Sequence, residues 1–133
     1  MNKKHVPSLE LCQEFDRLCK EKWIEVPETE YQWEKRMGEW SIVKSKELGV
    51  PYIDTADMKL YLPAPLVSEL GEWLPRKYKT MYFDTIREAG KWRMTYTDQI
   101  KKEYLEVFEE TTEANARQKM INYLLAEGII TTL

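Results

Sequence analysis

The sequence predicts an α+β domain in which an antiparallel sheet of four to five strands is packed by two main helices and one short helix. Three observations predict it: stretches with apolar residues every three or four positions, stretches of strict alternation, and glycines placed for tight turns between alternating stretches. The predicted order is helix, two strands, short helix, two or three strands, helix, within one domain spanning residues 1–133. Short turns imply antiparallel pairing, and each amphipathic helix needs the sheet as its apolar partner.

Size and composition indicate a folded chain with one hydrophobic core. The 133 residues are 43% hydrophobic and 32% charged and include five tryptophans, a balance typical of globular domains. No apolar run approaches the ~18 residues of a membrane-spanning helix, and the first residues lack the apolar stretch of a signal peptide. We therefore expect a cytoplasmic protein with no membrane partner.

The first helix is expected between Ser8 and Pro27. The Ser8 hydroxyl can accept a hydrogen bond from a free N–H of the first turn. Apolar residues then form one stripe, which consists of Leu11, Cys12, Phe15, Leu18 and Cys19. The two cysteines lie about two turns, or ~10 Å, apart on such a helix, which exceeds the reach of a disulfide. Buried free thiols are the simpler interpretation, and a redox or metal pair is the alternative.

Alternating aromatic and β-branched residues predict two strands between Glu30 and Ser45, joined at Gly38. Residues 27–30 could instead begin a short helix. Residues 48–63 have no clear period and are rich in turn residues, so we expect a long surface connection there.

Pro65 fits the first turn of a helix, and the apolar stripe that follows it ends at Pro75, which predicts the short helix. Residues 78–86 and 91–97 each alternate. The glycine of Glu88-Ala89-Gly90 between them permits the positive φ of a tight turn, so this is the clearest hairpin in the chain.

Residues 104–108 are a candidate third strand beside this hairpin. The last helix is expected to begin at residues 111–113, where threonine hydroxyls can cap free N–H groups and Glu113 suits the positive end of the helix dipole. Gly128 is expected to end it, because glycine accepts the left-handed conformation of a helix C-terminus.

Few residues suited to catalysis or metal binding are present. A zinc or iron site needs several converging ligands, and a nucleophilic triad needs a rigidly held histidine, whereas the single histidine, His5, lies near the N-terminus. The five glycines are dispersed singly, which excludes a phosphate-binding loop. Carboxylate pairs such as Asp54 with Asp57 could bind a divalent ion, but a solvated turn is the simpler interpretation. We expect no catalytic residue, no cofactor and no metal.

Charge is distributed unevenly along the chain. The net charge of −3 argues against general nucleic-acid affinity, but residues 76–102 contain eight basic and three acidic residues, a local balance of +5. Aromatic residues lie among them, so this hairpin is a candidate site for unpaired bases. The candidate residues are Lys79, Tyr82, Arg87, Lys91, Trp92 and Arg93. The simpler interpretation packs half of the aromatic residues against the helices and leaves the basic residues on the opposite, solvated face.

Five stretches, taken together, resemble a known family. They are Ser8–Cys12, Glu28–Trp33, Tyr61–Pro65, Glu69–Pro75 and Ala114–Ile129. The most distinctive parts are the Thr-Glu-Tyr-Gln-Trp strand, the Glu-Leu-Gly-Glu-Trp-Leu-Pro helix and the closing Leu-Leu-Ala-Glu-Gly-Ile. The succession is similar to small uncharacterised proteins encoded by bacterial phages, prophages and mobile elements. This family has no established activity, so the resemblance implies a bacterial or phage cytoplasmic setting and transfers no catalytic residue.

These observations favour a non-enzymatic accessory protein of a mobile element that binds another protein or itself. The missing catalytic groups support this hypothesis, as do the abundant Trp and Tyr residues, which are enriched at interface hot spots. The alternative is a weak single-stranded nucleic-acid binder that uses residues 76–102. An enzyme that relies on carboxylates alone is a third hypothesis.

Overall fold

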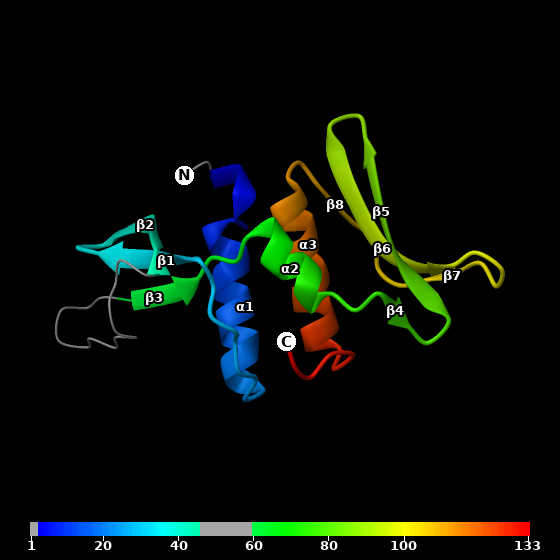
Figure 1. Cartoon of the computed structure of the whole chain (residues 1–133), viewed down its shortest axis with the longest axis horizontal. Coiled ribbons are helices and arrows are strands. Elements are labelled where there is room, and N and C mark those ends of the chain that lie inside the picture. The colour runs from blue at the N-terminus through cyan, green and yellow to red at the C-terminus, as the bar shows by residue number, and fades with distance from the viewer. Residues whose placement is uncertain (1–2, 46–59) are drawn as a thin grey trace.

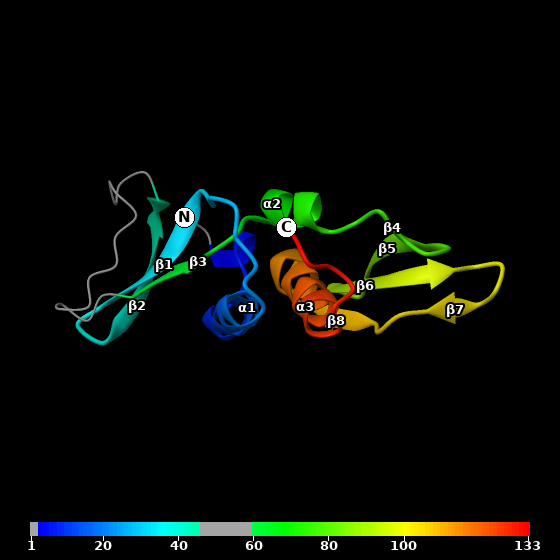
Figure 2. The ribbon, with the colours of Figure 1, turned by 90° about the horizontal axis from the view of Figure 1, so that it is seen from below.

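The structure is a computed structural model that describes residues 3–45 and 60–133. Helices form its centre, and an antiparallel sheet lies on either side of them (Figure 1, Figure 2). The helices are η1 (Lys3–His5, a 3-10 turn), α1 (Leu9–Glu21), α2 (Val67–Trp73) and α3 (Glu113–Ala126). The strands are β1 (Tyr31–Arg36), β2 (Glu39–Lys44), β3 (Leu60–Pro63), β4 (Lys77–Tyr78), β5 (Met81–Glu88), β6 (Lys91–Asp98), β7 (Glu103–Tyr104) and β8 (Phe108–Glu110).

The predicted α+β class is confirmed, with three α-helices and antiparallel strands in roughly the predicted order. The strands form two sheets. Sheet A has the order β2-β1-β3, and sheet B has the order β4-β5-β6-β7 with β8 also paired to β6. The two hairpins do not join because the helices lie between them (Figure 2), so each hairpin covers a different side of the helical layer.

Both long hairpins turn through two residues with positive φ. Met37 and Gly38 have φ values of 50° and 84°, and Ala89 and Gly90 have φ values of 53° and 77°. Positive φ at both central residues matches the twist of the flanking strands, and glycine adopts it without steric cost. These turns pair β1 with β2 and β5 with β6, as the sequence predicts.

The last residues of segment 48–63, which the sequence predicts to be a surface connection, form a strand. Leu60–Pro63 pairs with β1 as strand β3, and Leu62 lies opposite Trp33. Both of these side chains are buried, so a contact between segments far apart in the sequence forms this strand, and local periodicity does not reveal it. Asp54 and Asp57 lie outside the described residues.

The segment after the hairpin forms two short strands, β7 and β8, where the sequence predicts a single candidate strand at 104–108. Both strands pair with β6. Between them the Leu105 N–H donates to the Tyr96 carbonyl at 2.9 Å. The chain therefore stays beside β6 through the interruption, and sheet B gains an extra short strand.

The buried apolar side chains form two clusters, and each cysteine belongs to a different one. Cys12 packs with Trp33 and Leu62 beneath sheet A, whereas Cys19 belongs to the larger cluster between the helices and sheet B. Both thiols are free and buried, as the sequence predicts. Burial raises the pKa of Cys12 to about 12 and that of Cys19 to about 11. Both thiols are therefore protonated and unreactive near neutral pH.

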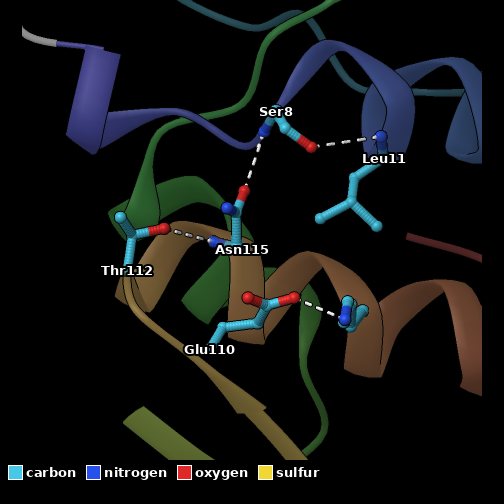
Figure 3. Close-up of polar contacts among 6 residues, drawn as sticks. Ser8, Leu11, Glu110, Thr112 and Asn115 are labelled. Atoms are coloured by element: carbon cyan, nitrogen blue, oxygen red, sulfur yellow. Dashed lines mark hydrogen bonds and ion pairs between the residues drawn. The ribbon is translucent and has the colours of Figure 1, made fainter. Parts of the chain in front are cut away.

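Polar side chains join α1 to α3. The Ser8 hydroxyl accepts the Leu11 N–H at 3.4 Å and so caps α1, and the Ser8 N–H donates to the Asn115 side-chain oxygen at 2.8 Å (Figure 3). The Thr112 hydroxyl accepts the Asn115 N–H at 3.2 Å and caps α3 (Figure 3). About one turn further along α1 and two turns further along α3, the Asn122 amide donates to the Leu11 carbonyl at 3.2 Å. The N-terminal ends of α1 and α3 therefore lie side by side.

Gly71, which has no side chain, allows α2 to approach α3 closely. The Arg117 guanidinium crosses α2 at Gly71, donates to the Val67 carbonyl at 3.1 Å and bonds Glu113 at 2.7 Å. A Cβ atom at Gly71 would overlap with this guanidinium. The glycine in the distinctive Glu-Leu-Gly-Glu-Trp sequence thus has a packing role.

We predict that Asn122→Ala lowers the free energy of unfolding by ~1–3 kcal/mol, because it leaves buried polar groups on both helices without their partner. The Asn122 side-chain oxygen accepts from the buried Gln118 amide at 2.9 Å, so the Gln118 N–H also loses its acceptor in the variant. Urea unfolding checks the prediction, with Gln13→Ala on the exposed face of α1 as the control. A loss no larger than that of the control would contradict the assigned contact.

Helices α1 and α3 end with the same backbone motif but with different residues. The Ile24 N–H donates to the Cys19 carbonyl at 2.8 Å, and the Ile129 N–H donates to the Leu124 carbonyl at 2.9 Å. The residue before each donor has positive φ, 58° at Trp23 and 70° at Gly128. Glycine is the usual residue at this position. Trp23 is nevertheless 94% exposed, so no buried contact of its indole offsets the backbone strain.

We predict that Trp23→Gly raises the free energy of unfolding by about 1 kcal/mol, because glycine takes positive φ without a Cβ clash. Gly128→Ala is the mirrored variant at the end of α3 and should lower stability by a similar amount. Thermal and urea unfolding of both variants measure this pair of opposite changes. A destabilised Trp23→Gly would show that the indole contributes to folding.

Candidate binding surface on sheet B

Sheet B has one face against the helices and one face that no described element covers. The side chains of Phe83, Met94 and Tyr96 point inward, where the rings of Phe83 and Tyr96 are in tilted contact with their centres 5.3 Å apart and Tyr96 is fully buried. Because successive side chains alternate, Tyr82 and Ile86 point to the opposite face. They are 59% and 43% exposed. We call this opposite side the open face.

A row of side chains crosses the open face at one end of the sheet. Strand register places Lys77 opposite Tyr82, Tyr82 opposite Thr97, and Thr97 opposite Tyr104. Tyr104 is 68% exposed. Only β6 separates the two tyrosines, so their backbones are ~10 Å apart. The Lys77 ammonium lies 5.4 Å from the centre of the Tyr82 ring, which is a cation–π contact.

A depression of about 630 Å³ lies beside this row. Its lining residues are Lys77, Thr80, Tyr82, Phe83, Asp84, Thr97, Asp98, Gln99, Ile100 and Lys101. Ile100 is 95% exposed. We refer to Tyr82, Tyr104, Ile100 and this depression as the tyrosine surface. Its charges are mixed, because two lysines and two aspartates line the same depression.

Asp98 shapes the loop that carries Ile100. Its carboxylate accepts the Ile100 N–H at 3.0 Å and the Lys101 N–H at 3.1 Å. The Lys101 N–H, followed by the Thr80 hydroxyl, lowers the pKa of this carboxyl group, because hydrogen bonds to a carboxylate favour its charged form. The side chain thus ties the β6–β7 loop to the β4–β5 turn and holds Ile100 at the rim of the depression.

The structure does not bring the six predicted nucleic-acid-binding residues to one face. The register places Tyr82, Lys91 and Arg93 on the open face. Arg87 and Trp92 lie on the other side, with the guanidinium 5.3 Å from the indole ring. The sixth residue, Lys79, lies in the turn between β4 and β5.

Of the tyrosine surface, the six candidates from the sequence include only Tyr82. They miss Tyr104, Ile100 and the two lysines that line the depression, Lys77 and Lys101. Asp98 followed by Gln-Ile-Lys is a signal for an Asx turn, so an exposed loop at Ile100 could have been inferred. The face that Tyr104 occupies depends on its pairing with Thr97, and no local pattern encodes that pairing.

No protein-family model, curated protein or solved structure matches this chain. Within residues 3–45 and 60–133, no three His, Cys, Asp or Glu side chains are grouped so that they could hold a metal ion. None of the described helices has the length and apolar character needed to cross a membrane. The tyrosine surface must therefore be interpreted from its own geometry.

We predict that the amide NMR signals of Ile100 and Lys101 titrate with a midpoint below 3.8, the ordinary pKa of an aspartate. Because the pKa of this carboxyl group is lower in the folded protein, its charged form orders the loop at pH values above that lowered pKa. The loop is released as the pH falls through it. Asp98→Asn should remove the titration and keep the loop, because an amide oxygen still accepts both N–H groups. A midpoint at or above 3.8 would contradict the assigned hydrogen bonds.

Proposed function

We propose that this chain is a non-enzymatic binding protein that recognises another protein through the tyrosine surface of sheet B. The observation that carries the proposal is the exposure of three large side chains at one end of sheet B: Tyr82 and Ile100 line one depression, and Tyr104 lies beyond Thr97 in the same row as Tyr82. Large apolar side chains that the fold leaves in water are typical of interaction sites when they cluster. Tyrosine combines a large apolar ring with a hydroxyl and is enriched among interface hot spots.

The charges around the surface favour a protein partner over nucleic acid. Asp84 and Asp98 line the same depression as Lys77 and Lys101, and carboxylates repel a phosphate backbone. Arg93 lies 3.9 Å from Glu109, and the Arg87 guanidinium stacks on Trp92 on the opposite face. The local excess of basic residues in 76–102 is thus partly neutralised and divided between faces, whereas nucleic-acid affinity depends on concerted phosphate contacts.

A bacterial cytoplasmic setting, in a cell that carries a phage or mobile element, belongs to the same proposal. The residues that support it are the five stretches resembling small phage and prophage proteins. Two of them, Glu69–Pro75 and Ala114–Ile129, overlap α2 and α3, and a third, Ser8–Cys12, begins α1, so the resemblance extends over the helical layer. The tyrosine surface lies in the part of the chain between these two stretches.

Single-stranded nucleic acid is the second candidate ligand. The observation that favours it is the pair of exposed tyrosines on one open sheet face, since unpaired bases stack on such rings. Lys77 and Lys101 lie beside them and could contact phosphates. Both candidates use the same side chains, so the same variants test them.

We predict that Tyr82→Ser/Tyr104→Ser reduces recovery of the specific protein partner from bacterial lysate at least about tenfold, the size expected from losing hot-spot contacts. Quantitative mass spectrometry of proteins captured by the full chain measures this. Met37→Ser in the β1–β2 turn, at a residue that is 95% exposed, is the matched control and should leave recovery unchanged.

A parallel titration with a fluorescent oligothymidine at low salt separates the two ligands. No change in anisotropy is expected for a protein-binding surface. Suppose instead that the oligothymidine binds, that the double tyrosine variant abolishes this binding, and that protein capture does not depend on the tyrosines. The ligand of the tyrosine surface would then be nucleic acid and not a protein.

A further inference from the structure

Strand β5 has a free edge next to the tyrosine surface. Strand β4 pairs with it only at Met81 and Tyr82, and the last backbone bond on that side joins the Phe83 N–H to the Arg76 carbonyl at 3.0 Å. From Asp84 to Glu88, no described strand pairs with this edge. Figure 1 shows β5 on the side of the β5–β6 hairpin away from β8 and α3.

The backbone groups available at this edge follow from the register. Backbone N–H and C=O groups alternate in direction along an antiparallel strand. Since the Phe83 N–H points away from β6, the N–H and C=O groups of Thr85 and Arg87 also point away from it. Unpaired groups of this kind form a template that a further strand can join.

The side chains on the open face of this edge alternate in character. Asp84, Ile86 and Glu88 follow each other on that face, in the order acidic, apolar, acidic. Neither carboxylate forms an ion pair with a cation in the described part of the chain. An added antiparallel strand places its own side chains directly opposite these three, where opposite charges stabilise and like charges destabilise the pairing.

The charge pattern disfavours a second copy of the chain as the occupant. Antiparallel pairing of two β5 edges about Ile86 places Asp84 of each copy opposite Glu88 of the other, which gives two repulsive pairs. A shift of the register by two residues toward the β5–β6 turn sets Arg87 opposite Arg87. The same shift in the other direction leaves only residues 84–86 to pair, because β4 and the Arg76 carbonyl already occupy the edge at Met81–Phe83. The first register opposes like charges on both sides of the Ile86 pair, and the second opposes them at the centre of the contact.

We propose that the free edge of β5 binds an extended segment of a partner protein as an added antiparallel strand. The segment carries a basic, an apolar and a basic side chain at alternate positions, opposite Glu88, Ile86 and Asp84. This inference rests on the proposed protein-binding function and specifies the shape and charge of the segment recognised. Main-chain hydrogen bonds to Thr85 and Arg87 supply affinity, and the alternating side chains supply specificity.

The test is an NMR titration of the full chain with an acetylated and amidated peptide, Thr-Lys-Thr-Val-Thr-Lys-Thr. The expected result is a shift and slower hydrogen exchange of the Thr85 and Arg87 amides. A control peptide with both lysines replaced by glutamate should bind about tenfold more weakly or worse, because two favourable cross-strand pairs become repulsive.

Two proline variants complete the test. Thr85→Pro removes an N–H that points away from the sheet, which an edge strand tolerates, and should abolish peptide binding with an unchanged circular dichroism spectrum. Ile86→Pro is the contrast, because its N–H points toward β6, and should destabilise the hairpin.

Four outcomes would overturn the inference. They are equal binding of the two peptides, no shift at Thr85 and Arg87, shifts at these amides that grow with protein concentration alone, and the same shifts on adding oligothymidine. Failure of the proposed function gives a different result, because protein capture from the lysate would then be independent of Tyr82 and Tyr104. Peptide binding at the edge does not depend on those side chains.

Discussion

The contact between α1 and α3 connects the two halves of the molecule. Sheet A packs on α1 and sheet B packs on α3, so the two sheets keep their relative position only through the helices. The helices run in the same direction, which brings two positive dipole ends together. Ser8, Thr112 and Asn115 satisfy free N–H groups at this junction, and an ion pair between Glu110 and Lys119 lies beside it (Figure 3). Directional hydrogen bonds fix one alignment where apolar packing alone would permit several.

This central helical layer explains where a binding surface can exist. Each sheet turns one face toward the helices, so the apolar residues of alternate strand positions have a buried partner. On sheet B, Tyr96 and Met94 are fully buried, while Tyr82 and Tyr104 on the other face are exposed. The fold therefore accounts for the first pair of residues, and the proposed function gives a role to the second pair.

Features encoded within a few residues were predictable, and features set by distant contacts were not. The turns at Gly38 and Gly90 and the capping residues Ser8 and Thr112 could be read locally. Strand parity also separates Tyr82 from Arg87, and Trp92 from Lys91 and Arg93, so the division of the six candidate residues between two faces was accessible from alternation. The separation into two sheets, the pairing of Leu62 with Trp33 and the position of Tyr104 depend on long-range register, which has no local signal.

The location of the two cysteines gives the chain a pair of internal reporters. Cys12 lies in the cluster under sheet A and Cys19 in the cluster shared with sheet B, and neither sulfur can meet a thiol reagent while its cluster is closed. Modification of each thiol therefore follows transient opening of its own half, as amide exchange does for local unfolding. Single-cysteine variants would report whether the halves open together or independently, and hence how cooperatively the α1–α3 junction couples them.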